Sequence, residues 1–143
     1  MADNKINPTS IPVFENPNIT GDYLEGYNVT AATVTAFYSR NIGYHYIRKS
    51  TGLIGLFVDC TNGSASDTLL VQLQFNYGTS GTNSWTTKTI TLAAAQLCNA
   101  STFYRIDINA TWRDCIPFDK LRIKFQKTGT NSVVAIKSRL MIA

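Results

Sequence analysis

Hydrophobic and polar residues alternate most regularly between Leu69 and Leu92. Apolar side chains recur at every second position up to Tyr77, and after a Gly-rich stretch a Thr-rich segment resumes the alternation at Trp85. Successive side chains of a strand point to opposite faces of a sheet, so a period of two indicates a strand with one buried face. The segment therefore predicts an antiparallel β-hairpin whose turn lies between Tyr77 and Trp85.

Further short runs of alternating or β-branched residues follow one another along the chain, separated by Asn-Gly and Gly-Thr turn signals. The predicted strands are Asn28 to Tyr38, Tyr44 to Arg48, Leu53 to Asp59, Leu69 to Tyr77, Trp85 to Leu92, Phe103 to Asn109, Lys120 to Lys127 and Val133 to Ile142. Only Leu92 to Leu97, with three alanines, has helical propensity. About eight strands of this kind predict an all-β fold, a single antiparallel β-sandwich or jelly roll over residues 27–143.

The first 26 residues lack a periodic apolar pattern and contain Pro8, Pro12 and Pro17. Proline removes a backbone donor and disfavours helix at its own position and at the residue before it. We therefore expect residues 1–26 to form an extended N-terminal arm that is held by something outside the domain.

A second predicted hairpin joins the last two strands. The register that buries the apolar side chains sets Phe125 opposite Ile136 and Leu121 opposite Leu140. The same register places basic side chains opposite one another on the outer face, in the pairs Arg122 with Arg139 and Lys124 with Lys137. Like charges directly opposite one another cost roughly 0.2 to 1 kcal/mol per pair, a penalty that an acidic partner would remove.

These charges predict a docking face for an acidic partner, to which the arm would add a second contact. The candidate docking residues are Lys120, Arg122, Lys124, Lys137, Arg139, Pro8, Pro12 and Phe14. A solvated face whose long side chains splay apart is the alternative interpretation.

The first hairpin has a polar but uncharged outer face. Matching Leu73 with Ile90 and Val71 with Leu92 buries its apolar side and leaves amides and hydroxyls outside, near an indole. Such groups can bind sugars, with the ring covering C–H faces and the amides bonding hydroxyls. The candidate glycan-binding residues are Gln72, Gln74, Asn76, Trp85 and Thr87. Ordinary solvent-facing strand residues are the alternative.

Candidate catalytic and metal-binding residues are sparse. His45 is the only histidine, and the alternation places it in a strand beside Ile47. Cys60, Cys98 and Cys115 form no C-x-x-C pair, so we predict no catalytic residue, no cofactor and no metal site.

Two acidic groupings leave alternatives open. Residues 59–67 are oxygen-rich but lack the spacing and terminal Glu of an EF-hand, which favours a plain Asn-Gly turn over a calcium loop. Asp107 and Asp114 could form a carboxylate pair, but nearby arginines favour ion pairing.

Composition narrows the classes of partner. Only 15% of the residues are charged, against an average near ~25%, and the net charge is +4. This balance permits an acidic partner without demanding one. The basic strands carry no aromatic residue on their charged side, which disfavours nucleic acid, and no run is long enough to span a bilayer. The N-terminus has no signal-peptide pattern, so we expect synthesis in a cytoplasm with reduced thiols.

The second half of the chain has a familiar order of elements. An alternating strand, a Gly-Thr-Asn-Ser-Trp turn and a Thr-rich strand precede residues 104–108 and 118–125, and a Gly-Thr turn closes the last of these. This order resembles small β-sandwich proteins of bacteriophage particles, such as capsid decoration or tail-associated proteins, and is also similar to carbohydrate-binding sandwich modules. The first resemblance implies a non-enzymatic virion protein that contacts other virion proteins and copies of itself. The second implies a glycan-binding module that uses the Gln/Thr face and Trp85.

Overall fold

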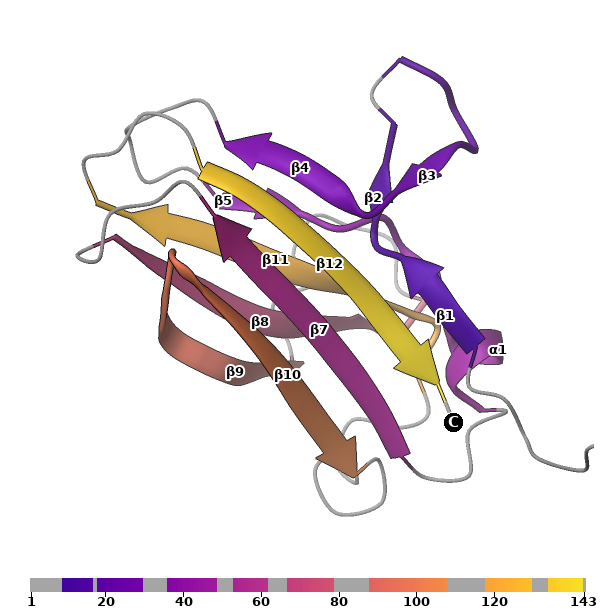
Figure 1. Cartoon of the computed structure of the whole chain (residues 1–143). Coiled ribbons are helices and arrows are strands. Elements are labelled where there is room, and N and C mark those ends of the chain that lie inside the picture. The colour runs from indigo at the N-terminus through magenta and orange to yellow at the C-terminus, as the bar shows by residue number, and fades with distance from the viewer. Residues whose placement is uncertain are drawn as a thin grey trace, which may run out of the picture.

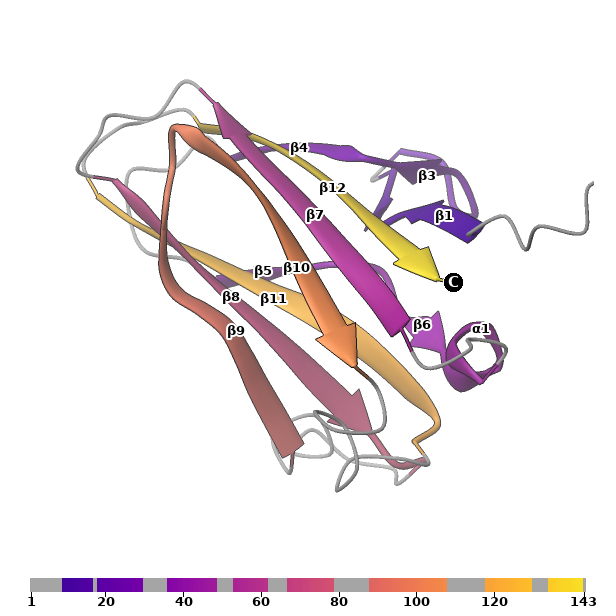
Figure 2. The same cartoon turned by 60° about the horizontal axis from the view of Figure 1, so that its bottom comes forward.

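The computed structural model describes residues 9–16, 18–29, 36–48, 53–61, 67–78, 88–107, 118–129 and 134–142. Two antiparallel sheets pack face to face, as Figure 2 shows, and a single-turn helix lies beside them (Figure 1). The predicted all-β sandwich is confirmed.

Each sheet draws strands from distant parts of the chain. Sheet I has the order β1 (Thr9–Pro12), β12 (Val134–Ile142), β7 (Leu53–Thr61) and β10 (Ala100–Asp107), and β4 (Gly26–Val29) also pairs with β12. Sheet II has the order β5 (Ala36–Tyr38), β11 (Lys120–Thr128), β8 (Thr68–Asn76) and β9 (Lys88–Leu97), and β6 (Ile42–Gly43) also pairs with β11. A small separate sheet contains β2 (Phe14–Glu15) and β3 (Tyr23–Leu24).

The connections follow the order of a jelly roll. When β1 and β4 are taken together as one edge strand and β2, β3 and β6 are set aside, sheet I holds the first, eighth, third and sixth strands of the described chain. Sheet II holds the second, seventh, fourth and fifth. Two Greek keys of this kind wrap the chain repeatedly from one sheet to the other.

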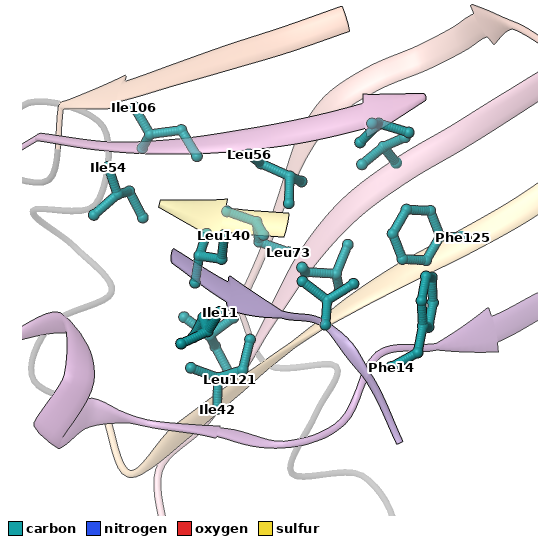
Figure 3. Packing of buried hydrophobic residues seen from close by; sticks show 14 of the residues in the cluster. Ile11, Phe14, Ile42, Ile54, Leu56, Leu73, Ile106, Leu121, Phe125 and Leu140 are labelled. Atoms are coloured by element: carbon teal, nitrogen blue, oxygen red, sulfur yellow. The ribbon is translucent and has the colours of Figure 1, made fainter. Parts of the chain in front are cut away.

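Apolar side chains from both sheets meet between the layers (Figure 3). Phe125 of β11 lies near the centre, where its ring stacks on Phe37 with centroids 5.3 Å apart and contacts Phe14 at 5.4 Å. Full burial of a side chain of this size contributes roughly 1.5 to 3 kcal/mol. The alternation in sequence thus builds the core, because every second residue of each long strand points inward.

The predicted hairpin of β8 and β9 forms, with one local change of register. Leu73 lies opposite Ile90 as predicted, but Val71 lies opposite Ala93 instead of Leu92, because the register shifts on both sides of Val71. β9 also continues to Leu97, so the helical propensity expected beyond Leu92 is wrong. Pairing with β8 outweighs the small helical preference of alanine.

β11 and β12 do not form the predicted hairpin. β11 pairs with β5, β6 and β8, whereas β12 pairs with β1, β4 and β7 in the opposite sheet. Phe125 therefore lies opposite Val71, and Ile136 lies opposite Cys60. Alternation specifies which face of a strand is buried and leaves its neighbour open. The ladder of opposed like charges inferred from that hairpin is accordingly wrong.

Helix α1 (Tyr44–Ile47) replaces a predicted strand. The Tyr44 N–H donates to the Asp119 carbonyl at 2.9 Å, and the Arg48 N–H donates to the Tyr44 carbonyl at 2.9 Å. Residues three apart share one side of a helix, so Ile47 is buried while the Tyr44 ring packs edge-on against Phe118, with centroids 4.8 Å apart. A spacing of three places these two apolar residues on the core side.

The expected N-terminal arm is in part an edge of the sandwich. β1 pairs with residues 139–142 of β12 and β4 pairs with residues 134–137, so the two strands follow one another along the same edge. Ile11, Val13 and Phe14 are buried in the core. For these residues the expectation of an outside holder is wrong, because the domain itself holds them. Between β1 and β4 the β2–β3 hairpin projects from the edge (Figure 1).

Candidate interaction surface

The outer face of sheet II carries basic side chains along its central strand. Lys120, Arg122 and Lys124 alternate with buried residues of β11 and therefore point away from the core. Their cross-strand neighbours include Tyr38 of β5 and Gln72 and Gln74 of β8. We call these six side chains the outer basic face. The structure thus places parts of the predicted docking set and of the predicted glycan set side by side on one surface.

Arg122 is held in a defined orientation on this face. Its guanidinium carbon lies 3.8 Å from the centroid of the Tyr38 ring, and its Nε donates to Gln74 Oε1 at 2.8 Å. Burial lowers the pKa of Arg122, and Tyr38 acts in the opposite direction. A guanidinium nevertheless stays charged in proteins. The role of Tyr38 could not be predicted from the sequence, because the pairing of β5 with β11 joins segments far apart in the chain.

The amides of β8 form hydrogen bonds within the protein. Gln72 Nε2 donates to Thr91 Oγ1 at 3.0 Å, and Asn76 Oδ1 accepts from the Gly78 N–H at 2.8 Å. Gln74 and Asn76 are buried. They are therefore removed from the predicted glycan-binding set, because neighbouring side chains cover the outward positions of a central strand. Trp85 and Thr87 lie outside the described residues.

Basic side chains outnumber acidic ones on the main strands of sheet II. The sequences of β5, β8, β9 and β11, as the structure bounds them, contain no aspartate or glutamate. Alternate residues of a strand are roughly 7 Å apart, close enough for each of the three outward cations of β11 to repel the next one along the strand. Asp119 precedes β11 and is exposed at its end. The outer basic face is therefore suited to a partner that supplies carboxylates.

The other predicted basic residues lie on the opposite side of the molecule. Lys137 is exposed on the outer face of sheet I, where it pairs in register with Asp59. Arg139 forms an ion pair with Glu25 at 3.2 Å, and its Nε donates to Ser10 Oγ at 2.6 Å. Lys137 and Arg139 therefore cannot join β11 in one docking face, because the core separates the two sheets.

The three arm residues predicted to dock, Pro8, Pro12 and Phe14, differ in where they lie and in whether the structure describes them. Phe14 is only 2% exposed and packs against Phe125, so it has no surface to offer a partner and is removed from the docking set. Pro12 is half-buried in β1, where it pairs in register with Arg139 of sheet I. An edge strand tolerates proline because one side of it has no partner strand. Pro8 lies outside the described residues.

The β2–β3 hairpin has exposed apolar side chains and a turn that is held by backbone hydrogen bonds. The Asn16 N–H donates to the Asp22 carbonyl at 2.8 Å, the Asp22 N–H donates to the Ile19 carbonyl at 3.2 Å, and Gly21 adopts a positive φ of 85°. Ile19 is 57% exposed, and Tyr23 and Leu24 are exposed beside it. Exposed apolar groups gathered on one element mark contact sites. The turn residues between Asn16 and Asp22 were a usable signal for this hairpin.

The hairpin adjoins the outer basic face. Arg40 follows Tyr38 by two residues, and its guanidinium carbon lies 4.0 Å from the centroid of the Tyr23 ring. Its Nε also donates to the Pro12 carbonyl at 3.0 Å, and its N–H donates to the Val13 carbonyl at 2.7 Å. Arg40 therefore connects the end of β5 to the base of the hairpin.

The described residues hold few groups suited to catalysis. No three of their His, Cys, Asp and Glu side chains gather as metal ligands would. His45 lies exposed on α1 instead of in a strand, with its ring centroid 4.2 Å from that of Tyr46. Asp114 and Cys115 lie outside the described residues. None of the helices described is long and apolar enough to cross a membrane.

Comparisons with known proteins show distant structural likeness. No protein-family model and no curated protein matches the sequence. A chain of the T13 particle of infectious bursal disease virus is 11% identical with a TM-score of 0.48, over 99% of this chain and 32% of that chain. A human norovirus chain is 8% identical with a TM-score of 0.45, over 96% of this chain and 33% of that chain. Xylanase 10C of Cellvibrio japonicus is 13% identical with a TM-score of 0.45, over 99% of this chain and 28% of that chain.

A prophage protein, YomS of SPBc2, gives 10% identity and a TM-score of 0.36, over 87% of this chain and 99% of that chain. The chain spans about a third of the length of the viral chains it resembles. Similarities of this degree describe β architecture and do not identify a function.

Proposed function

We propose that the protein is a non-enzymatic structural protein of a virus particle, a capsid decoration or tail-associated component that acts as a symmetric oligomer. The outer basic face attaches it to an acidic surface of another virion protein. The observation that carries this proposal is the row of Lys120, Arg122 and Lys124 in the centre of a sheet whose four main strands contain no carboxylate.

The geometry of Arg122 supports a carboxylate as the group that is bound. The stack on Tyr38 and the hydrogen bond to Gln74 fix the guanidinium before a partner arrives. A fixed side chain loses less conformational entropy on binding, and a planar guanidinium can bind a carboxylate through two parallel hydrogen bonds. Carboxylates beside Lys120 and Lys124 would also relieve their mutual repulsion.

The β2–β3 hairpin supplies the apolar part of the contact. Stable interfaces combine an apolar centre with a polar rim, and side chains that fill pockets in the partner contribute most of the affinity. Ile19 on the projecting turn and Leu24 of β3 are both exposed. The contact that the sequence assigned to an extended arm is thus made by this hairpin.

Charge reversal on the two faces of the sandwich tests the proposal. Lys124→Glu and Lys137→Glu make the same chemical change in β11 and in β12, on opposite sides of the core. Each variant is supplied in trans to particles of the encoding virus that lack the wild-type chain, and the copies per particle are counted by quantitative mass spectrometry. We expect Lys124→Glu to lower incorporation at least about tenfold, since a change of 1.4 kcal/mol is a factor of ten. Lys137→Glu should incorporate like wild type.

Equal incorporation of both variants would overturn the attachment through the outer basic face. A glycan array gives the matching test of the carbohydrate-binding alternative. Specific binding of a sugar that Tyr38→Ala abolishes, together with unchanged incorporation of Lys124→Glu, would favour that alternative over the virion role.

A further inference from the structure

Two buried cysteines from opposite sheets meet at one end of the core. Cys60 lies near the end of β7 in sheet I, and Cys98 directly follows β9 of sheet II. Their exposed fractions are 1% and 0%. The two thiols share a side-chain hydrogen bond, so their sulfur atoms are in contact.

The backbone around Cys98 fixes this approach. Ala100 pairs in register with Cys60, which places the turn at Cys98 and Asn99 next to the end of β7. The Cys98 N–H also donates to the Asp67 carbonyl at 2.9 Å, next to the start of β8. Asn99 is exposed, so Cys98 lies just below the surface although its own side chain is covered.

A buried ion pair lies close to the two thiols. Lys127 Nζ lies 3.6 Å from Asp67 Oδ2, and both side chains are buried. The hydrogen bond with Cys60 lowers the pKa of Cys98, whereas burial and the Asp67 carboxylate raise it, and the Lys127 ammonium has a smaller lowering effect. The same hydrogen bond and burial raise the pKa of Cys60. The thiolate is the reactive form of cysteine. Cys98 lies in the turn beside the exposed Asn99, so it is the thiol of the pair that is placed to react first.

We propose that Cys60 and Cys98 are a site of reversible disulfide formation that links sheet I to sheet II. With oxidised glutathione as oxidant, the Cys98 thiolate attacks one of its sulfur atoms, forms a mixed disulfide and expels one glutathione thiolate. Cys60 then loses its proton to solvent and attacks the Cys98 sulfur, which expels the second glutathione. The protein gives up two electrons and two protons, and oxidised glutathione becomes two molecules of reduced glutathione.

The bond would constrain a large part of the fold. The chain between Cys60 and Cys98 contains β8 and β9, so the closed loop includes half of sheet II. Closing a loop of this length restricts the unfolded chain, and for a domain of this size we expect the melting temperature to rise by roughly 10 °C. The sandwich would then be held by a covalent bond at the end where β9 passes to β10.

Peptide mapping after oxidation tests the proposal. The wild-type chain and a Cys115→Ser variant are incubated with oxidised glutathione, digested without reduction and analysed by mass spectrometry, and their melting curves are recorded. We expect a Cys60–Cys98 linked peptide in both proteins, a loss of two hydrogen masses in the Cys115→Ser variant, and a higher melting temperature that dithiothreitol reverses. Cys60→Ser in the Cys115→Ser background is the matched control and should show neither linkage nor stabilisation.

Three results would overturn the inference. The first is a stable glutathione adduct that never resolves to the linked peptide, and the second is a disulfide that maps to Cys115 instead. A Cys60–Cys98 linkage that lowers the melting temperature would show that the native geometry does not accommodate the bond. The wild-type map requires no substitution, so it stays informative if a variant folds poorly.

Discussion

The guanidinium of Arg122 lies over the ring of Tyr38, with its carbon 3.8 Å from the ring centroid, while its Nε donates to Gln74. One side chain thus connects β5, β11 and β8 across the outer face of sheet II. The contact gives this face a fixed geometry as well as a charge. A solvated face whose long side chains splay apart would have no such contact.

Replacing Arg122 by lysine separates the effect of geometry from that of charge. Arg122→Lys keeps the positive charge but removes the planar fork and the stack on Tyr38. We expect binding to the acidic partner to weaken about tenfold, measured by co-sedimentation with particles over a range of salt concentrations. Arg105→Lys makes the same change at an exposed position of sheet I and should bind like wild type. Equal loss in both variants would argue against a specific role for Arg122.

The hairpin tip can be altered without affecting the core. Ile19 is 57% exposed, so Ile19→Asp should change the free energy of unfolding by no more than about 0.5 kcal/mol, as chemical denaturation would measure. It should nevertheless reduce incorporation into particles, because an apolar contact is replaced by a charge. Thr20→Asp adds the same charge on the same turn without removing apolar surface, so it is the control. If Thr20→Asp lowers incorporation as much as Ile19→Asp does, the added charge alone explains the loss.

The buried ion pair should matter far more to stability than the exposed one. Lys127→Met leaves the carboxylate of Asp67 buried without its cation, and we expect a loss of about 3 to 5 kcal/mol in the free energy of unfolding. Adding Asp67→Leu should restore part of this loss, because the uncompensated charge is removed. Glu25→Gln, which breaks the half-exposed pair with Arg139, should cost no more than about 1 kcal/mol. Urea denaturation measures all three, and a loss in Lys127→Met no larger than in Glu25→Gln would contradict this assignment.

Stability at high pH should depend on Tyr104. Its hydroxyl donates to Gln96 Oε1 at 2.5 Å, and burial raises the pKa of Tyr104, with a hydrogen bond to Thr102 acting in the opposite direction. A pKa raised in the folded state means that the native protein holds this proton more tightly than the unfolded chain does. The contribution is therefore complete below about pH 10 and is lost as the pH rises through the raised pKa. The melting temperature, measured from about pH 8 to about pH 11, should fall more steeply with pH for wild type than for Tyr104→Phe.

Periodicity predicted the buried faces of the long strands well. Leu73 meets Ile90 as the alternation requires. The inward apolar residues whose burial the structure describes reach the core, namely Leu121, Ile123 and Phe125 of β11 and Ile136, Leu140 and Ile142 of β12. The neighbours of β11 and β12 could not be predicted, because each strand has one buried face whether the two pair with each other or lie in opposite sheets, as they do here. Because of this error, Lys137 and Arg139 were predicted to share a face with the basic residues of β11, although they lie on the opposite side of the molecule.

Local propensity failed where tertiary contacts decide the conformation. The alanines after Leu92 favour helix, yet pairing with β8 extends them as a strand. Tyr44 to Ile47 alternates like a strand, but a single helical turn buries Ile47 and packs Tyr44 on Phe118. Of the candidate site, the basic residues of β11 were predictable from sequence, whereas the position of Tyr38 beside them depends on pairing between distant segments.

A cryo-electron microscopy reconstruction of the particle with this protein bound tests the central claim most directly. We expect the face of sheet II to lie against the neighbouring virion protein, with acidic side chains opposite Lys120, Arg122 and Lys124 and the β2–β3 hairpin in contact with the same neighbour. A reconstruction in which the outer face of sheet I contacts the neighbour while β11 faces solvent would contradict the account.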